Sequence, residues 1–390
     1  MITLSEISDT SGKPSTAEEL EANFKKVTIS HPRLIECFEE LKAIESPEAG
    51  GKTEIVVAVV GPPAAGKSRL SDRLELHFLD KYREKMTLQP DFLPVVKLEI
   101  PSPADGNFNW KDFFTRLLDS CQEVMIGQKQ GESLGIEIDG IKAARASNLS
   151  LPVVRRAAVK CLKKRGVRVL ILDEAAHFLE LGASKRAVMQ FRMIKSLASE
   201  LGIPILLVGS YDLLGLLDYD GQLIRRTTII HFSRYTQEEW ADVKSAGHKA
   251  FLSFMHSLLT RVPIKVSAEV AAASNYLFAS SLGTAGLLKD LVFRALKLAL
   301  RQGAAELTLE HIRRVRLRNK ELLSMLREIE AGEAKLRDEE DDALFTALRL
   351  GAQKTSPPEG RGVKQKPTGS GKSPRKGVRK PGRDPLGEAA

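Results

Sequence analysis

The sequence lacks the features of a membrane or secreted protein. No uninterrupted apolar run approaches the ~18–20 residues that a membrane-spanning helix requires. Residues 1–13 contain no basic segment followed by an apolar core, so no secretory signal is expected. The three cysteines, Cys37, Cys121 and Cys161, are too widely spaced for a metal site or a disulfide framework. These absences predict a cytoplasmic protein with no membrane partner.

Positive and negative charges nearly balance along the chain, except at the C-terminal end, where positive charges are in excess. The net charge is +9, and residues 354–390 hold ten Lys/Arg against Glu359, Asp384 and Glu388. The rest of the chain carries 49 basic and 47 acidic groups. Residues 351–390 are rich in Pro, Gly, Ser and Lys and poor in large apolar side chains, which predicts a disordered basic tail. Nucleic acid is the partner that such a tail favours, and a merely solubilising tail is the alternative.

One motif with known chemistry follows the apolar, β-branched residues 55–60, which predict a buried strand. The motif G-x-x-x-x-G-K-[ST] consists of Gly61, Pro62, Pro63, Ala64, Ala65, Gly66, Lys67 and Ser68, and a helical pattern begins with Arg69. Strand, glycine loop and helix are the context that a phosphate-binding loop requires. Backbone N–H groups would hold phosphate oxygens, Lys67 would reach the β- and γ-phosphates, and Ser68 would bind Mg²⁺. The chain is predicted to bind a nucleoside triphosphate.

A second apolar strand pattern, at residues 166–174, ends in two adjacent carboxylates. Asp173 occupies the Walker B position, where it would hold Mg²⁺ beside the phosphate loop. Glu174 can orient and deprotonate an attacking water, which favours hydrolysis over phosphoryl transfer to a substrate. His177 follows one turn later, where a helix-packing role is favoured over a catalytic one.

Strands and helices alternate through the first part of the chain. Five strands are predicted at residues 55–60, 93–100, 166–173, 203–210 and 227–232, with helices between them. This order predicts an α/β fold with a parallel sheet covered on both faces. A capping box at residues 236–239 opens a mostly helical region that continues to about residue 350. The predicted domains are an N-terminal helical segment (1–50), a P-loop ATPase core (51–235), a helical lid with C-terminal helices (236–350) and the tail (351–390).

The distance between the two motifs narrows the class. Lys67 and Asp173 are 106 residues apart, enough for a whole strand and at least two helices. This is the additional-strand arrangement of ATPases that work as rings. Ser210, at the end of the fourth strand, would then sense the γ-phosphate. Capping of a helix at residues 211–217 is an equally good interpretation of Ser210.

Several spaced segments together resemble one family. They are GPPAAGKS (61–68), DGNFNWKDFFTRLLDSC (105–121), LILDEAAHF (170–178), IPILLVGSYDLL (203–214), QLIRRTTIIHFSRY (222–235) and SLGTAGLLKDLVFRAL (281–296). The series resembles the AAA+ ATPases of transposition, the MuB, TnsC and TniB group, over roughly residues 17–318. The resemblance implies an AAA+ core with a five-stranded parallel sheet and a helical lid. It also implies an ATP-dependent regulator that forms a ring or helical filament on double-stranded DNA and recruits or activates a DDE transposase, with a target-selector protein as a possible further partner.

Carried over by position, the resemblance implies further site residues. Lys67, Ser68 and Asp173 would hold ATP and Mg²⁺, and Ser210 would be the first sensor. Arg225 and Arg226 precede the fifth strand, where such proteins present an arginine finger to the neighbouring subunit; a solvated basic pair is the alternative. Lys289 stands where many AAA+ proteins carry a sensor arginine, so this position departs from the family pattern.

Contacts with DNA are predicted for basic residues after the second strand and before the Walker B strand. The candidates are Lys111, Lys129, Lys142, Arg145, Arg155 and Arg156. Phosphate contacts by Lys and Arg give affinity without sequence specificity, which suits a protein that must accept many targets. Each of these side chains taken singly is also compatible with an ordinary solvated charge.

Three alternative functions share the same motifs. A helicase loader or replication initiator would use the same ATP machinery. A signalling or defence ATPase would respond to nucleotide and ignore DNA. A small-molecule kinase is disfavoured by the Asp173–Glu174 pair, by Arg225 and Arg226, and by the long helical lid.

Overall fold

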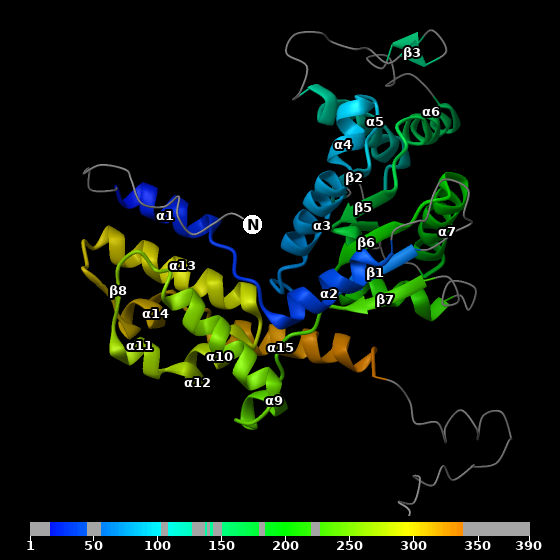
Figure 1. The fold of residues 1–390 in the computed structure, drawn as a ribbon. Helices are drawn as coiled ribbons and strands as arrows, with labels where there is room; N and C mark the ends of the chain where they lie inside the picture. The colour runs from blue at the N-terminus through cyan, green and yellow to red at the C-terminus, as the bar shows by residue number, and fades with distance from the viewer. Residues whose placement is uncertain are drawn as a thin grey trace, which may run out of the picture. The chain divides into compact units, whose positions relative to one another are not determined.

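A five-stranded parallel sheet forms the centre of the region that carries the phosphate loop. Its strands are β1 (Val56–Val60), β2 (Val95–Glu99), β5 (Val169–Asp173), β6 (Ile205–Gly209) and β7 (Thr227–His231). Their spatial order is β2-β5-β6-β1-β7, so β6 lies between the loop strand and the strand that ends in Asp173 (Figure 1). Counted along the chain, this is the order 2-3-4-1-5. The predicted fold class, a P-loop α/β core with a parallel five-stranded sheet, is confirmed.

The computed structural model describes residues 16–44, 56–102, 108–126, 137–138, 141–142, 150–178, 184–219 and 227–337. All of them lie in one compact unit that ends at Arg337. The disordered tail predicted for residues 351–390 lies outside the described residues, as do residues 338–350 of the predicted lid. None of the described helices has the length and apolar character that crossing a membrane demands.

Alternate residues of the buried strands contribute to two separate cores, one on each face of the sheet. Val57 and Val59 point toward the face covered by α2 (Pro32–Lys42) and α3 (Lys67–Lys81). Val56, Ala58 and Val60 belong to the opposite core. The helices of that core are α5 (Trp110–Ile126), α6 (Leu151–Lys164) and α7 (Ser184–Leu201). A strand buried on both faces needs an apolar residue at every position, which explains the unbroken apolar runs in the sequence.

A helical lid follows the sheet. It contains α9 (Gln237–Ala241), α10 (Ala246–Leu259), α11 (Ala268–Ala272), α12 (Ser274–Ser281), α13 (Ala285–Arg301), α14 (Leu309–Val315) and α15 (Asn319–Ala334). Two short parallel strands, β8 (Lys265–Val266) and β9 (Glu306–Leu307), join its far side. The predicted capping box is present, since Thr236 accepts from the Glu239 amide and Glu239 accepts from the Thr236 amide.

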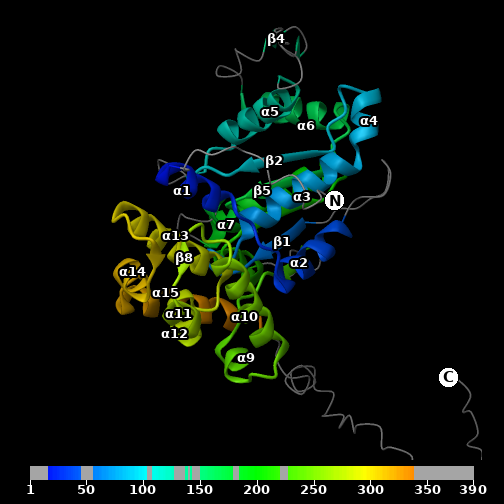
Figure 2. The ribbon, with the colours of Figure 1, turned by 60° about the vertical axis from the view of Figure 1, so that its left-hand side comes forward.

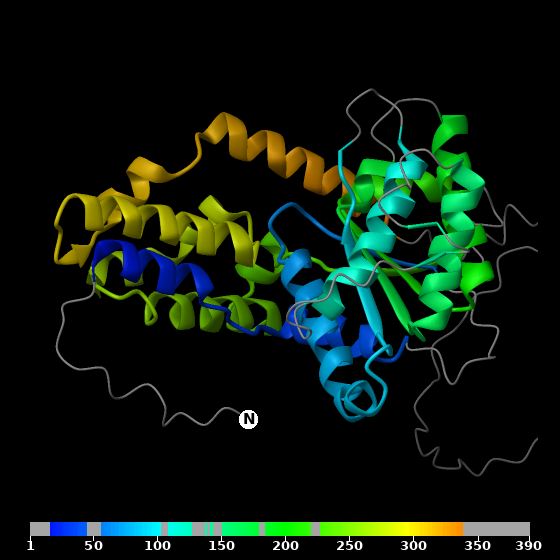
Figure 3. The same ribbon diagram turned by 90° about the horizontal axis from the view of Figure 1, so that it is seen from above.

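The N-terminal helix α1 (Ala17–Lys26) packs on the lid rather than on the sheet. It lies beside α13 in all three ribbon views (Figures 1, 2 and 3). Phe24 is buried in the lid core and stacks on Phe293 with ring centroids 6.4 Å apart. Lys297 pairs with Glu21 at 3.6 Å. The chain then crosses to the sheet, where α2 begins at Pro32, a residue whose fixed φ suits the first helical turn.

Some local structure differs from the sequence prediction. The segment after β6 is a 3₁₀ helix, η3 (Tyr211–Tyr219), where an α-helix was an alternative. Tyr211 and Leu214 are both buried, and a three-residue spacing suits a 3₁₀ turn. Elements that the sequence analysis did not predict are α4 (Arg83–Leu88), the hairpin of β3 (Glu137–Ile138) and β4 (Ile141–Lys142), and the 3₁₀ turn η2 (Ala175–Phe178).

Candidate nucleotide-binding site

The phosphate loop connects β1 to α3 at the carboxyl edge of the sheet. Gly66 caps α3 with φ +107°, and Ala64 also has a positive φ of 56°. A Cβ on Gly61 would overlap the Phe232 carbonyl oxygen, so only glycine fits there. Backbone N–H groups at the start of α3 have no intrahelical acceptor and can bind phosphate oxygens. The loop therefore has the backbone form that the motif predicts.

The ammonium group of Lys67 bonds to the backbone at the start of the phosphate loop. Its Nζ donates to the carbonyl oxygens of Gly61 at 2.9 Å and Pro62 at 2.8 Å. Burial lowers the pKa of Lys67 to about 8, and the carboxylates of Glu174 and Asp173 act in the opposite direction. The fold thus brings Lys67 within electrostatic reach of Asp173 and Glu174, which lie more than 100 residues later in the sequence. A phosphate group entering the loop would offer Lys67 a charged partner in place of two carbonyls.

Asp173 is buried at the end of β5, with 5% of its surface exposed. Its Oδ2 accepts from Ser71 Oγ at 2.8 Å, and its Oδ1 accepts from the Glu174 amide at 3.0 Å. Lys97 Nζ, on the neighbouring strand β2, is 3.9 Å from Asp173 Oδ2 and forms an ion pair with Asp72. These contacts fix the orientation of the carboxylate that the Walker B motif assigns to Mg²⁺.

The donor set fits magnesium held together with a nucleotide rather than a metal held by protein alone. Among the described residues there is no group of three His, Cys, Asp or Glu side chains that could hold a metal ion. Magnesium in nucleotide sites commonly takes only one or two protein ligands and completes its shell with phosphates and water. Ser68, exposed in the first turn of α3, and Asp173 are ligands of that kind. Glu174, the next residue, is exposed and has a positive φ of 52°.

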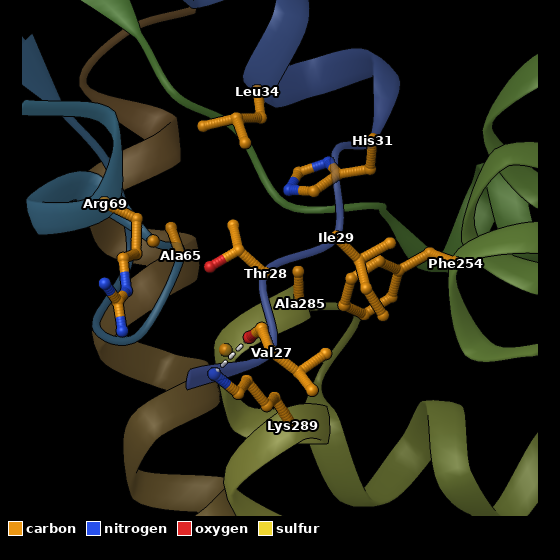
Figure 4. A pocket seen from close by; sticks show the side chains of 12 residues that line it. Val27, Thr28, Ile29, His31, Leu34, Ala65, Arg69, Phe254, Ala285 and Lys289 are labelled. Atoms are coloured by element: carbon orange, nitrogen blue, oxygen red, sulfur yellow. Dashed lines mark hydrogen bonds between the residues drawn. The ribbon is translucent and has the colours of Figure 1, made fainter. Parts of the chain in front are cut away.

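The lid contacts the phosphate loop directly and closes one side of a pocket. A Cβ on Gly286, at the start of α13, would overlap the carbonyl oxygen of Ala64. The pocket is open to solvent and has a volume of about 70 Å³, which is smaller than the ~300–1,000 Å³ of most small-molecule sites. Its walls come from the segment between α1 and α2, the phosphate loop and the lid (Figure 4). They include Val27, Ile29, His31, Ala65, Gly66, Arg69, Phe254, Ala285 and Lys289. The walls beside the phosphate loop are largely apolar.

Lys289 lines this pocket, but its ammonium group is already engaged. Nζ donates to the carbonyl oxygens of Lys25 at 2.9 Å and Val27 at 2.6 Å (Figure 4). Desolvation, followed by the nearby charge of Arg69, lowers the pKa of Lys289. Lys289 therefore holds the N-terminal segment against the lid, while Arg69 lines the pocket from α3.

Two further predicted residues have local partners. Ser210 follows β6 directly, and its Oγ donates to Asp212 Oδ2 at 2.7 Å. The ring nitrogen Nδ1 of His177 lies 2.7 Å from the Ile100 carbonyl oxygen, which agrees with a packing role.

The predicted finger and DNA contacts are only partly within the described residues. Arg225, Arg226, Lys129 and Arg145 lie outside them, as does the side chain of Lys142 on β4. Arg155 donates to Ser196 at 2.8 Å and pairs with Glu200 at 3.0 Å, so it fastens α6 to α7. Arg156 is exposed on α6, and Lys111 is half-buried in the first turn of α5.

Sequence reasoning missed Ser71, Lys97 and the segment between α1 and α2. Ser71 comes four residues after Lys67, a spacing that places both on one face of α3, so helical periodicity could have found it. Lys97 carried a weaker signal, since it is one of two charged residues, with Glu99, in an otherwise apolar strand. The pocket wall at Val27 and Ile29 carried no motif at all, because it depends on the packing of α1 against the lid.

Part of the chain is similar to a known protein family. Residues 138–237 match the family model described as Bacterial TniB protein. The resemblance to the TniB group is confirmed. The matched region runs through β5, β6 and β7 and includes Asp173, Glu174, Ser210, Arg225 and Arg226. The match covers 100 of the 390 residues.

The whole chain also has distant structural similarity to solved proteins. No curated protein sequence matches. Among solved structures, the Aeropyrum pernix ORC2 protein in ADPNP–ADP complexes is 14% identical with a TM-score of 0.47, covering 77% of this chain and 73% of that one. The Walker-type ATPase PABY2304 of Pyrococcus abyssi is 16% identical with a TM-score of 0.42, covering 80% and 76%. The RuvB Holliday junction branch migration motor of Thermotoga maritima is 16% identical with a TM-score of 0.34, covering 77% and 71%. These likenesses carry no conclusion about function.

Proposed function

We propose that this protein is an ATP-dependent regulator of transposition that assembles as a homo-oligomer on double-stranded DNA and recruits or activates a DDE transposase. The observation that carries the proposal is the TniB match across the segment that contains β5, β6 and β7. That segment holds Asp173, Glu174, Ser210, Arg225 and Arg226, which by position would distinguish bound ATP from bound ADP in a ring ATPase. The phosphate loop, which lies outside the matched region, supplies the nucleotide-binding half of the same site.

The chemistry follows from the residues around the loop. Lys67 would exchange its two carbonyl acceptors for β- and γ-phosphate oxygens. Arg69 and the apolar walls of the pocket would contact the nucleoside part of ATP. Ser68 and Asp173 would hold Mg²⁺, which neutralises charge on the phosphates when bound. Glu174 would accept a proton from the attacking water. Ser210 would contact the γ-phosphate after releasing Asp212, and Arg225 or Arg226 would reach the site of a neighbouring subunit.

Assembly on DNA would follow from nucleotide binding. The lid rests on Ala64 through Gly286, and Lys289 ties the N-terminal segment to the same lid helix. A nucleotide filling the pocket would contact all three parts and fix one arrangement of them. A fixed lid would let one subunit offer its arginines to the next. Sequence-independent DNA contacts, including those of the basic tail, would hold the assembly on any target.

The test is DNA binding measured as a function of nucleotide. The full chain should bind a random-sequence duplex more tightly with a slowly hydrolysed ATP analogue than with ADP. Lys67→Ala should remove that difference, because it removes the main phosphate ligand. If nucleotide binds but DNA affinity stays negligible in every nucleotide state, the signalling ATPase becomes the better account. A helicase loader would bind DNA but would fail to stimulate strand transfer by a DDE transposase.

A further inference from the structure

The most strongly charged segment among the described residues lies in the lid, away from the candidate nucleotide site. Residues 313–320, which join α14 to α15, contain five cations and no carboxylate: Arg313, Arg314, Arg316, Arg318 and Lys320. We refer to this segment as the basic connector. It links two helices drawn in orange in Figure 3. The 353 residues before the tail have 49 basic and 47 acidic groups, so this concentration stands out against a near-neutral body.

Apolar side chains hold the backbone of the connector in place. Ile312, just before it, is fully buried, and Val315 and Leu317 are partly buried against the cores. The backbone is extended at Arg316 and Arg318. Arg313, Arg314, Arg318 and Lys320 are exposed. The backbone of the connector is therefore held in place while four of its cationic side chains are exposed to solvent.

Local pairing neutralises only part of this charge. Arg314 pairs with Glu310 at 2.9 Å, and Arg318 pairs with Glu321. Arg313 and Lys320 have no ion-pair partner among the described residues. Arg316 Nε donates to Ser280 at 2.9 Å and its Nη2 to Asn319 at 2.7 Å, while its guanidinium carbon lies 5.4 Å from the centre of the Tyr276 ring. A guanidinium held in this way keeps a fixed orientation, which lowers the entropy cost of binding a planar or tetrahedral anion.

Helix stability does not account for the arrangement. Cations stabilise the C-terminal end of a helix, which suits Arg313 and Arg314 at the end of α14. Arg318 and Lys320, however, lie at the N-terminal end of α15, where the helix dipole disfavours positive charge. Five neighbouring cations also repel one another. A segment that stabilised only the lid would not place cations there, so a polyanionic partner is the better explanation.

We propose that the basic connector is a contact surface for the phosphate backbone of double-stranded DNA. The inference rests on the proposed function and adds a lid surface to the DNA contacts predicted from the sequence. Four exposed cations within eight residues match the close spacing of phosphates along a duplex, one per ~3.4 Å of each strand. Guanidinium groups bind phosphate through paired N–H donors, and contacts to phosphate carry no sequence information. The contact is therefore independent of sequence.

The experiment compares two triple variants of the full chain. Arg313→Ala/Arg314→Ala/Lys320→Ala removes three charges from the connector, and Lys244→Ala/Lys249→Ala/Arg261→Ala removes three exposed charges elsewhere in the lid. Affinity for a random-sequence duplex is measured at several salt concentrations with a slowly hydrolysed ATP analogue. Each lost phosphate contact lowers the slope of log affinity against log salt by about 0.9. The connector variant should lose about 2–3 units of slope and at least about tenfold in affinity at low salt, while the control keeps the parental slope.

Equal slopes for the connector variant and the control would overturn the inference and leave the proposed function standing. No measurable DNA binding by the parental protein would instead contradict the proposed function itself. Polyglutamate serves as an acidic polypeptide probe. If only polyglutamate binding depended on the connector, the partner would be an acidic protein and the DNA assignment would be wrong. Nucleotide affinity and thermal midpoint, measured in parallel, should be unchanged in both variants because all six side chains lie on the surface.

Discussion

Gly286 of the lid helix α13 lies directly against Ala64 of the phosphate loop. The approach is so close that a Cβ on Gly286 would overlap the Ala64 carbonyl oxygen. No flexible side chain separates the two backbones, so a movement of α13 toward the loop must displace the loop backbone. Nucleotide occupancy and lid position are therefore coupled through one backbone contact.

Gly286→Ala should weaken nucleotide binding. The added methyl group has to displace either α13 or the loop, and both line the pocket. We expect a loss of at least about tenfold in affinity for a fluorescent ATP analogue, equivalent to about 1.4 kcal/mol. Gly215→Ala is the matched control, since nothing lies within 4 Å of a Cβ at that position. Parental affinity in Gly286→Ala would show that the lid does not rest on the loop in solution.

Glu174→Gln should separate binding from hydrolysis. The substitution removes the proposed base while leaving Lys67, Ser68 and Asp173 in place, so nucleotide affinity should change by less than about threefold while turnover falls by at least about 10². Phosphate release and analogue binding measured on the same preparation give both numbers. Turnover at the parental rate would mean that another group activates the water.

His31 should make the stability of the folded chain depend on pH. Burial, followed by the charge of Arg33, lowers the pKa of His31 to about 4, and its Nδ1 lies 3.2 Å from the Tyr235 hydroxyl. A histidine in the unfolded chain titrates near 6.5. The folded state therefore binds fewer protons between these values, so stability is full above about pH 6.5 and falls as the pH decreases toward 4.

Urea unfolding at pH 7.5 and 4.5 measures this effect. The parental protein should lose roughly 2–3 kcal/mol more than His31→Gln over that interval, because carboxylate titrations are common to both proteins. His256→Gln, which changes a histidine on the exposed side of α10, should behave like the parental chain. An equal pH dependence in the parental and His31→Gln proteins would contradict a buried neutral imidazole.

Arg234 and Glu333 should fasten α15 to the ATPase core. Arg234 Nε donates to Glu333 Oε1 at 2.9 Å and Nη2 to Oε2 at 3.1 Å, and the two side chains are 3% and 14% exposed. Glu333→Ala leaves a buried guanidinium without its carboxylate and should cost about 3–5 kcal/mol of unfolding free energy. Arg234→Met combined with Glu333→Leu should recover much of that loss. A double variant as unstable as the single one would mean that shape, rather than charge, is what the site requires.

The sequence predicted the sheet and the loop because both depend on short-range patterns. Five apolar strand patterns and one glycine motif specify local structure directly, and a buried parallel sheet leaves little freedom in how they assemble. The long separation of Lys67 and Asp173 indicated an additional strand but did not specify the strand order. The positions of Asp173 and Glu174 were predictable from local pattern too, since Asp173 ends β5 and Glu174 follows it directly.

Contacts between distant segments were not predictable in this way. The burial of Phe24 in the lid, the bonds of Lys289 to Lys25 and Val27, and the pairing of Arg155 with Glu200 depend on side chains that meet only after folding. A lysine at position 289 looks like a sensor in a motif, but its ammonium group bonds two carbonyl oxygens of the N-terminal segment. An arginine at position 155 looks like a DNA contact, but it reaches α7.

Sedimentation of the full-length Glu174→Gln protein with duplex DNA tests the central claim most directly, because this variant should hold ATP without consuming it. With ATP, Mg²⁺ and DNA together, the account predicts large DNA-bound oligomers, and with ADP or without DNA much smaller species. Adding Arg225→Ala and Arg226→Ala to the same protein should prevent the large species from forming. A monomer under every combination of nucleotide and DNA would contradict the account.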